Sequence, residues 1–204
     1  AGVLDTERFD EMKVYVGRGV GGGSLVNGGM AVTPGRSYFS RVLPQVDGDE
    51  MYSTYYPRAN AALQVAAPPV DIIGTAEYYQ YARTSARHAT AAGFEVVSVP
   101  NVYDWDHMRR EHVGHRGAVR SALDQEVIFG NNHGKRSLPR TILGTARATG
   151  LVNVIPFTEV TRMVQTRTGY ALSLKTIDFQ GNVVGQRVAT YDKVVLAAGS
   201  LGTT

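Results

Sequence analysis

A glycine-rich segment between residues 17 and 30 constrains the fold of this chain more than any other feature. It carries seven glycines in fourteen positions, reading Gly-Arg-Gly-Val-Gly-Gly-Gly-Ser-Leu-Val-Asn-Gly-Gly-Met, and it follows the apolar run Val14–Val16. Glycine loses more conformational entropy on folding than any other residue. Such a density therefore indicates a backbone that adopts left-handed angles or lies close against a bulky group. A phosphate or a flat ring is a group of this kind.

The start of the segment matches the dinucleotide fingerprint G-x-G-x-x-G through Gly17, Gly19 and Gly22. That motif places a pyrophosphate at the N-terminus of a helix that begins within it. Asn27-Gly28-Gly29 would break such a helix, and the acidic residue expected about twenty positions on is missing. We therefore interpret the match as misleading. Two alternatives stay open: an NAD-dependent dehydrogenase with a true fingerprint, and a β-hairpin that turns at Asn27-Gly28.

Composition excludes several classes of function. The chain has 204 residues, 43% hydrophobic and 19% charged, which is ordinary for a globular protein. Its net charge is +3, but the basic residues are scattered, so we expect no nucleic-acid partner. The absence of cysteine excludes disulfides, thiolate metal sites and cysteine nucleophiles. The first residues lack the pattern of a signal peptide, and neither Ser24 nor Ser200 stands in a G-x-S-x-G motif.

Periodicity and punctuation predict the helices. We expect a helix over residues 49–63 that is interrupted at Pro57, and another over 75–92 with Thr75 as its N-cap and Gly93 at its end. Tyr78 and Tyr81 recur at helical spacing in the second of these, which favours a place in the core. A third helix opens at Ser137, with proline in its first turn, and closes at Gly150.

The strand signals indicate a mixed α/β fold with an antiparallel insertion. Strands are expected at 12–16, 94–100, 153–156, 159–166, 170–178 and 183–190, and the last three are separated by the turn signals Thr168-Gly169 and Gln180-Gly181-Asn182. Residues 194–198 are continuously apolar, which is typical of a strand buried in a parallel sheet. We expect residues 101–136 to form a long ordered loop system. The sequence stops just after a glycine turn that should open a helix, so we interpret the chain as a fragment.

Histidines cluster in the middle of the chain without a recognisable metal pattern. His107, His112 and His115 surround Glu111, but their spacing matches no zinc motif, and a solvated polar loop is the simpler interpretation. His133 stands in the turn Gly-Asn-Asn-His-Gly and is a candidate base, although an asparagine-rich turn explains the same residues. We assign no metal ligand and no catalytic residue from these patterns.

Four strings of the chain agree in order and spacing with one known family. They are residues 17–32, Val99-Pro-Asn-Val-Tyr-Asp104, Glu126-Val-Ile-Phe-Gly-Asn-Asn-His-Gly-Lys135 and Ala197-Ala-Gly-Ser-Leu-Gly202. Together they resemble the glucose–methanol–choline oxidoreductases, and within them the cholesterol oxidases that hold FAD without a covalent bond. The resemblance extends over essentially the whole chain. It implies an FAD-binding, Rossmann-like portion with an antiparallel β-meander, plus part of a substrate-binding domain.

The resemblance also implies which residues contact FAD. The glycine-rich segment would be a second FAD-binding stretch, because the family's N-terminal fingerprint lies upstream. The resemblance implies that four residues lie near the pyrophosphate and ribityl chain: Gly21, Gly22, Gly23 and Ser24. It implies that four more lie against the isoalloxazine ring: Asn27, Gly28, Gly29 and Met30. Val160 matches a main-chain contact to adenine, and Gly199 and Ser200 match the turn after the last strand of the nucleotide domain. The residues implied to line the substrate cavity are Met30 and Val32.

By the same resemblance, residues 1–36 and 140–204 belong to the FAD-binding domain, and residues 37–139 mainly to the domain that covers the substrate. The implied reaction oxidises the 3β-hydroxyl of a sterol to a ketone with O2, which yields hydrogen peroxide, and then isomerises the Δ5 double bond to Δ4. The implied setting is a secreted monomer that contacts membranes peripherally to obtain sterol.

One departure from the family pattern concerns catalysis. The family's catalytic histidine, asparagine and glutamate lie toward the C-terminus, beyond Thr204, so the chain as given is expected to be inactive alone and no catalytic residue is assigned. A non-catalytic sterol- or nucleotide-binding module is therefore the alternative function.

Overall fold

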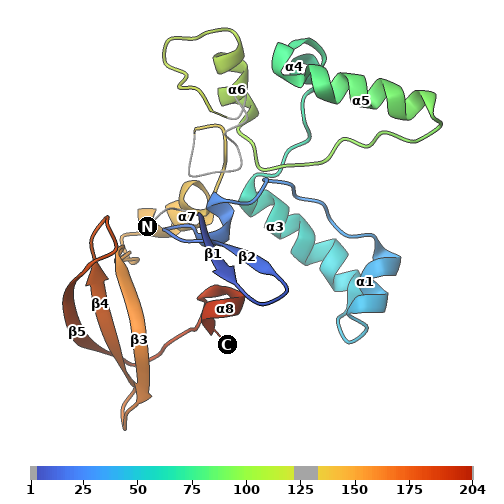
Figure 1. Cartoon of the computed structure of the whole chain (residues 1–204). Coiled ribbons are helices and arrows are strands. Elements are labelled where there is room, and N and C mark those ends of the chain that lie inside the picture. The colour runs from blue at the N-terminus through green and yellow to red at the C-terminus, as the bar shows by residue number, and fades with distance from the viewer. Residues whose placement is uncertain (1–3, 122–132, 204) are drawn as a thin grey trace. The chain divides into compact units, whose positions relative to one another are not determined.

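The computed structural model describes residues 4–121 and 133–203. The chain divides into two compact units, Gly2–Asn153 and Val154–Thr204 (Figure 1). Within the described residues, no helix combines the length and the apolar character needed to cross a membrane. The assignment of residues 1–36, 37–139 and 140–204 to functional domains stays a prediction.

The larger unit combines a β-hairpin with short helices. Its strands are β1 (Leu4–Arg8) and β2 (Lys13–Gly17), followed by a 3₁₀ helix at Gly22–Leu25. The α-helices are α1 (Arg36–Val42), α2 (Gly48–Glu50), α3 (Tyr56–Leu63), α4 (Val70–Thr75), α5 (Gln80–Ala91), α6 (Trp105–His112) and α7 (Ile142–Ala148). A π-helical turn (Met51–Tyr55) joins α2 to α3, and two further 3₁₀ helices lie at Glu77–Tyr79 and Leu138–Arg140.

The glycine-rich segment begins at the end of the hairpin. β1 and β2 pair antiparallel from Leu4 opposite Gly17 to Arg8 opposite Lys13, which confirms the strand predicted at 12–16 and adds a partner strand that was not predicted. The β-hairpin hypothesis for Asn27-Gly28 is wrong. The N–H groups of Val26 and Asn27 both bond back to the Gly23 carbonyl, so the chain curls into a helical turn there and forms no strand pair.

Pro57 does not interrupt its helix. The chain is helical from Gly48 to Leu63, but the turn just before the proline is a π turn in which Tyr56 N bonds to Met51 O. Proline has no N–H to donate, and its ring would crowd the carbonyl of the preceding turn. A wider turn relieves that crowding, so the helix continues through the proline instead of breaking.

The helix predicted over 75–92 is correct at its end and wrong at its start. Gly93 takes a left-handed φ of 82° just after α5, as a C-terminal glycine should. Thr75, however, is the last residue of α4 and not an N-cap, because the chain bends at Ala76 before a 3₁₀ turn leads into α5. Tyr78 and Tyr81 are 50% and 84% exposed, so the prediction that they lie in the core is also wrong.

A small core instead forms around α4 and α6. Ile72, Ala76, Trp105 and Met108 are buried together, and Tyr79 rather than Tyr78 packs beside Trp105. α6 lies in the region expected to be loop, with the Asp104 side chain capping it by accepting from His107 N. Residues 94–100 run without strand pairing, so that strand prediction is wrong. Of the string 126–135 that resembles the family, residues 126–132 lie outside the described residues.

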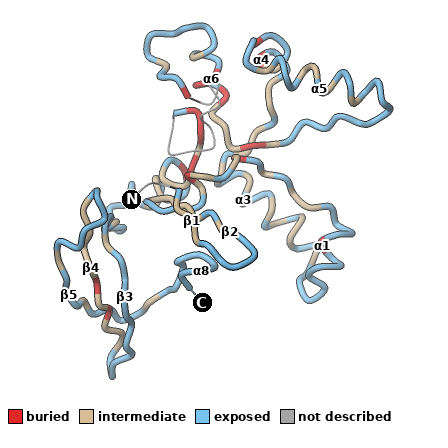
Figure 2. Tube along the Cα trace, viewed as in Figure 1, coloured by how far each residue is buried: buried red, intermediate tan, exposed pale blue. Residues whose placement is uncertain are grey.

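The smaller unit is the predicted antiparallel meander. β3 (Thr158–Gln165), β4 (Tyr170–Ile177) and β5 (Val183–Tyr191) form a sheet in that order. The turns fall at Gly169 and Gly181, as expected, and Gly181 has a left-handed φ of 89°. Leu172 and Leu174 on the central strand are the buried residues of the sheet, shown in red in Figure 2. This confirms the mixed fold class with antiparallel sheets.

The segments flanking the meander differ from prediction. Residues 153–156 form no strand. Residues 194–198 are also irregular, and Val195 is 88% exposed, so the buried parallel strand is wrong for this structure. A parallel strand is buried only where neighbours cover both of its faces, and none of the three strands in this unit pairs with it. The predicted glycine turn into a helix is confirmed, because Gly199 has a φ of 77° and begins α8 (Gly199–Thr203).

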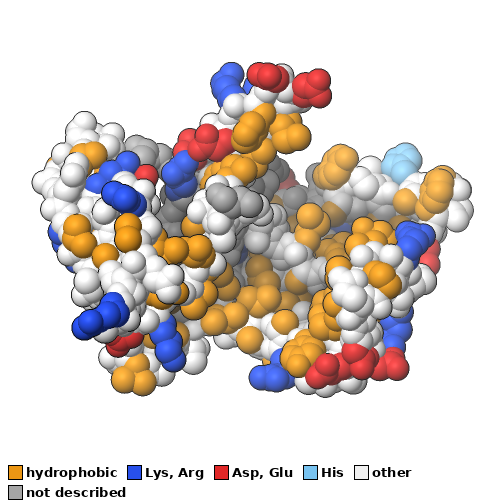
Figure 3. All heavy atoms as spheres, turned by 90° about the horizontal axis from the view of Figure 1, so that it is seen from below, with side chains coloured by type: hydrophobic (Ala, Val, Ile, Leu, Met, Phe, Trp, Pro, Cys, Tyr) orange, Lys and Arg blue, Asp and Glu red, His pale blue; other side chains and the backbone are white. Residues whose placement is uncertain are grey.

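Large apolar side chains are exposed in both units. Val70 on α4 in the larger unit is 86% exposed, and Phe179 in the smaller unit is 79% exposed; hydrophobic side chains are coloured orange in Figure 3.

Candidate functional site

The second half of the glycine-rich segment is held by donors from distant parts of the larger unit. Lys135 Nζ donates to the Asn27 carbonyl at 2.5 Å, and the Tyr103 hydroxyl donates to the Gly28 carbonyl at 2.6 Å. The next carbonyl, that of Gly29, accepts from Val102 N at 2.9 Å. Three consecutive carbonyls are therefore bound by Lys135, Tyr103 and Val102, which fixes the orientation of the peptides in this half of the segment.

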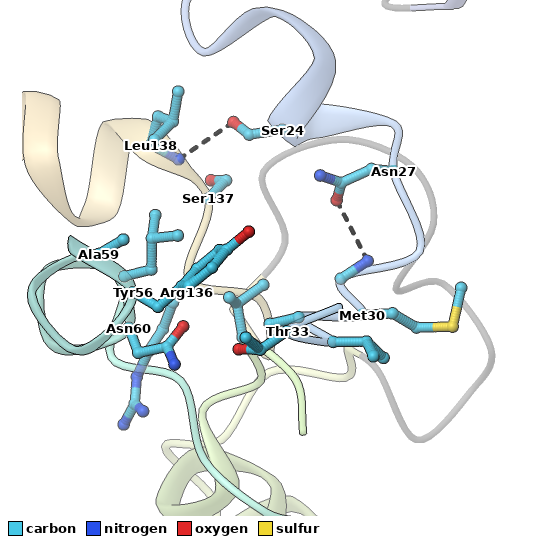
Figure 4. Close-up of a pocket in the computed structure, with 15 residues that line it drawn as sticks. Ser24, Asn27, Met30, Thr33, Tyr56, Ala59, Asn60, Arg136, Ser137 and Leu138 are labelled. Atoms are coloured by element: carbon cyan, nitrogen blue, oxygen red, sulfur yellow. Dashed lines mark hydrogen bonds between the residues drawn. The ribbon is translucent and has the colours of Figure 1, made fainter. Parts of the chain in front are cut away.

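The first half of the segment is fastened through Ser24. Its hydroxyl donates to the Gly21 carbonyl at 2.7 Å and accepts from Leu138 N at 3.1 Å. The second of these bonds is drawn in Figure 4. The Ser24 hydroxyl thus already has both a donor and an acceptor within the protein. Its place in the structure is to join the 3₁₀ helix of the segment to the 3₁₀ helix Leu138–Arg140, which precedes α7; the helix predicted to open at Ser137 therefore begins as a separate 3₁₀ helix.

The glycines of the segment differ in what surrounds them. A Cβ on Gly17 would lie 2.6 Å from the Gly22 carbonyl oxygen, and one on Gly21 would lie 2.7 Å from Pro139 Cδ. A Cβ on Gly29 would lie 2.6 Å from the Tyr103 ring. By contrast, nothing lies within 4 Å of a Cβ built on Gly22 or Gly23. The first group must be glycine for internal packing, whereas the second leaves backbone open to an incoming group.

A cavity of about 460 Å³ adjoins this segment (Figure 4). Five of the predicted site residues line it: Ser24, Asn27, Gly29, Met30 and Val32. The opposite wall is one face of α3, including Tyr56, Ala59, Asn60 and Leu63, and the segment Arg136–Leu138 contributes as well. Met30 is 73% exposed, and in Figure 4 its thioether extends away from α3. The cavity lies entirely within the larger unit.

Lys135 is buried directly beneath the segment. None of its surface is exposed, and burial lowers the pKa of its ammonium to about 8. Tyr103 is half-buried, and burial raises the pKa of its hydroxyl. Both residues lie in strings that resemble the family, but the sequence predicted no role for either of them. No local signal marks them, because their partners lie 108 and 75 residues away in the chain.

The other predicted FAD contacts lie in the smaller unit. Val160 is on β3 opposite Leu174 and is 53% exposed. Gly199 and Ser200 begin α8. The structure does not place this unit relative to the glycine-rich segment, so these three contacts stay predictions.

Two of the histidines, His107 and His133, pack together, whereas His112 and His115 are exposed, so the solvated polar loop predicted for this region is wrong for His107. His107 is buried on α6; its Nε2 lies 2.9 Å from the Val119 carbonyl, and its ring stacks on His133 with centroids 5.6 Å apart. Glu111 accepts from both the N–H and the hydroxyl of Ser121, at 2.7 and 2.6 Å. These bonds tie the loop after α6 back onto the helix.

A comparison with protein-family models decides the family. The model described as GMC oxidoreductase, which represents the N-terminal domain of that family, matches residues 1–204. The chain belongs to the GMC oxidoreductases. That domain is the FAD-binding domain, so the cofactor of this GMC oxidoreductase is FAD and its chemistry is flavin-dependent oxidoreduction.

The residues of this GMC oxidoreductase fit a flavin cofactor. At Gly22 and Gly23 the backbone is open, so a bulky anionic group can approach the main chain closely. Lys135 binds the Asn27 carbonyl, which leaves the Gly28 N–H at the opposite edge of that peptide for a ligand, whereas the Gly29 N–H already donates to Asn27 Oδ1 at 3.1 Å. Apolar side chains beside the segment offer a surface that excludes water from a flat ring.

Proposed function

We propose that this GMC oxidoreductase is a sterol oxidase, which oxidises the 3β-hydroxyl of a sterol such as cholesterol to the 3-ketone and isomerises the Δ5 double bond to Δ4. The observation that carries the proposal is the cavity beside the glycine-rich segment. Its volume of about 460 Å³ falls within the usual range of ligand pockets, roughly 300–1,000 Å³. Its lining includes Met30, Val32, Ala59 and Leu63, which suit an apolar substrate better than a sugar.

Bound FAD supplies the redox chemistry of the reaction. The carbinol carbon loses a hydride and the hydroxyl loses a proton, and O2 takes up both electrons and two protons as hydrogen peroxide. The chain's own residues bind and orient. The backbone at Gly22 and Gly23 and at Asn27–Met30 holds the cofactor, and the wall formed by Val32 and α3 positions the substrate and excludes water.

The setting of the protein follows from the same proposal. A sterol substrate resides in membranes, so the enzyme would contact a membrane surface peripherally and would act as a secreted monomer. The family resemblance supports these statements.

Blocking the cavity tests the substrate. The full-length protein is prepared with Val32→Trp, which would place a large ring in the cavity, and with Val70→Trp as the matched control. Val70 is 86% exposed on α4 and does not line the cavity. We expect Val32→Trp to lower kcat/KM for cholesterol by about a hundredfold, roughly 3 kcal/mol, with little effect on a small alcohol. Val70→Trp should match the wild type.

Two results would overturn the proposal. A wild-type protein that lacks flavin absorbance near roughly 450 nm would contradict the flavin site. A flavin-loaded protein that releases no hydrogen peroxide with any 3β-hydroxysterol would contradict the sterol substrate, and saturable sterol binding without flavin would instead favour the non-catalytic binding module.

A further inference from the structure

Lys135 is a buried cation whose role the flavin chemistry described above does not explain. None of its surface is exposed, and its Nζ donates at 2.5 Å to the Asn27 carbonyl. Across residues 4–121 and 133–203, no carboxylate pairs with this ammonium. Burying a charge without an opposite charge is costly, and such groups concentrate at functional sites. The position of Lys135 beneath the segment expected to contact the flavin ring indicates which site it serves.

The geometry of the peptide bond shows how Lys135 can act at a distance. The described chain has no cis peptide bonds, and in a planar trans peptide the C=O and the N–H point in opposite directions. Because the Asn27 carbonyl points at Lys135, the N–H of Gly28 points away from it. Among the described residues, no acceptor takes up that N–H. Gly28 carries no side chain, and a Cβ built there would meet only the end of Met30, at 3.8 Å.

A charged donor that binds the carbonyl of a peptide also strengthens the N–H of the same peptide as a donor. Hydrogen bonds to ionised groups are stronger than neutral ones, and bonds in series polarise one another in a protein interior. The ammonium draws electron density toward the Asn27 oxygen, so the Gly28 N–H becomes a stronger donor. The neighbouring peptide provides a comparison, since its carbonyl accepts from the neutral Tyr103 hydroxyl at 2.6 Å.

We propose that Lys135 is a positioning residue of the flavin site: it fixes and polarises the Asn27–Gly28 peptide, so that the Gly28 N–H donates to an electron-rich atom of the cofactor. The inference rests on the proposed contact between Asn27–Met30 and the flavin ring. The cofactor gains electrons on reduction. A polarised N–H and a nearby buried positive charge therefore stabilise its reduced form more than its oxidised form.

The midpoint potential of bound FAD tests this role, because it compares the two redox forms directly. In the full-length, FAD-loaded protein we would replace Lys135 with Met, which removes both the charge and the donor, and with Gln, which removes the charge and keeps an N–H donor on a side chain one bond shorter. Tyr103→Phe is the matched control, since it removes a neutral donor from the adjacent carbonyl of the same segment.

We expect Lys135→Met and Lys135→Gln to lower the affinity for reduced FAD relative to oxidised FAD about tenfold, which for a two-electron couple is a potential lower by about 30 mV. Tyr103→Phe should change the ratio of the affinities for reduced and oxidised FAD less than about threefold. Should Lys135→Met fail to fold, Lys135→Gln decides. An unchanged potential in Lys135→Gln would overturn the inference, and so would an equal fall in Tyr103→Phe, because simple loosening of the segment would then explain both.

The two proposals fail in different ways. A wild-type protein without FAD would refute the flavin site itself. A wild-type protein that holds FAD but does not oxidise sterols would refute the proposed substrate, and the measurement of the midpoint potential would still be possible. A wild type that holds FAD, with a potential insensitive to Lys135, would refute only the role of this lysine.

Discussion

The ring of Tyr103 occupies the space that a side chain on Gly29 would need. A Cβ on Gly29 would approach Tyr103 Cε1 to 2.6 Å, while the hydroxyl of the same tyrosine donates to the Gly28 carbonyl at 2.6 Å. The tyrosine thus both excludes side chains from this part of the segment and fixes its backbone. Several expected outcomes follow from such contacts, and each can be measured on the full-length protein.

Gly29→Ala should destabilise the fold and release FAD. The substitution combines the clash with Tyr103 and a left-handed φ of 74°, so we expect a loss of about 2 to 4 kcal/mol in the free energy of unfolding. Urea unfolding measures it. The matched control is Gly23→Ala, where a Cβ meets nothing within 4 Å. Gly23→Ala should keep its stability and bind FAD more weakly. If only Gly29→Ala bound FAD weakly and Gly23→Ala bound it normally, that result would argue against a cofactor contact at Gly23.

Lys135 should make stability rise with pH in the alkaline range. Burial lowers its pKa from 10.5 to about 8, so between these values the unfolded state holds a proton that the folded state has lost. The free energy of unfolding should therefore increase by about 2 to 3 kcal/mol between pH 8 and pH 10. Above pH 10 the slope reverses, because burial raises the pKa of Tyr79 to about 12 and the unfolded tyrosine ionises first.

Urea unfolding across this pH range checks the expected slope. Lys135→Met should flatten it, whereas Lys13→Met, at an exposed position on β2, should preserve it. A slope that survives Lys135→Met would show that another group carries it.

Ser24→Ala should weaken the link between the glycine-rich segment and the 3₁₀ helix Leu138–Arg140. The change removes the acceptor of Leu138 N and the donor to the Gly21 carbonyl, and we expect a loss of about 1 to 2 kcal/mol. Ser53→Ala is the control, because its hydroxyl bonds to the Asp49 carbonyl on an exposed helix surface. Equal stability of the two variants would contradict a structural role for Ser24.

Met108→Ala should disrupt the core between α4 and α6. Met108 is fully buried against Ile72, Ala76 and Trp105, so truncation should cost about 2 to 5 kcal/mol through lost contacts and a cavity. Met12→Ala, at a residue that is 62% exposed, should cost far less. Chemical denaturation followed by Trp105 fluorescence reads the change at the core itself, and similar losses in both variants would contradict the core assignment.

The features predicted correctly from sequence are those with local signals. Glycine turns at 169 and 181 delimit the meander strands, and Gly93 and Gly150 mark helix ends through their left-handed angles. The helix α6 was missed because its sequence is mostly charged and histidine, although Asp104 could have indicated a cap. A buried strand was predicted at residues 194–198 because the segment is continuously apolar. Apolar composition indicates that a segment favours burial, but whether it pairs as a strand depends on neighbours elsewhere in the chain.

The candidate site was predicted only in part for the same reason. The glycine-rich segment is visible in sequence, and four of its predicted residues line one cavity together with the predicted Val32. Its supports are not visible. Lys135 and Tyr103 act through contacts with residues 108 and 75 positions away, and no periodicity encodes such pairs.

The π turn before Pro57 sets the angular phase of the cavity wall. It adds one residue to a turn of the helix, and in an α-helix one residue corresponds to a rotation of about 100° around the axis. The side of α3 that bears Ala59 and Leu63 faces the cavity, and its angle relative to the helical residues before Met51 includes the rotation of that extra residue. Shortening Met51–Tyr55 by a single residue would turn this wall about a quarter of a revolution away while leaving its composition unchanged.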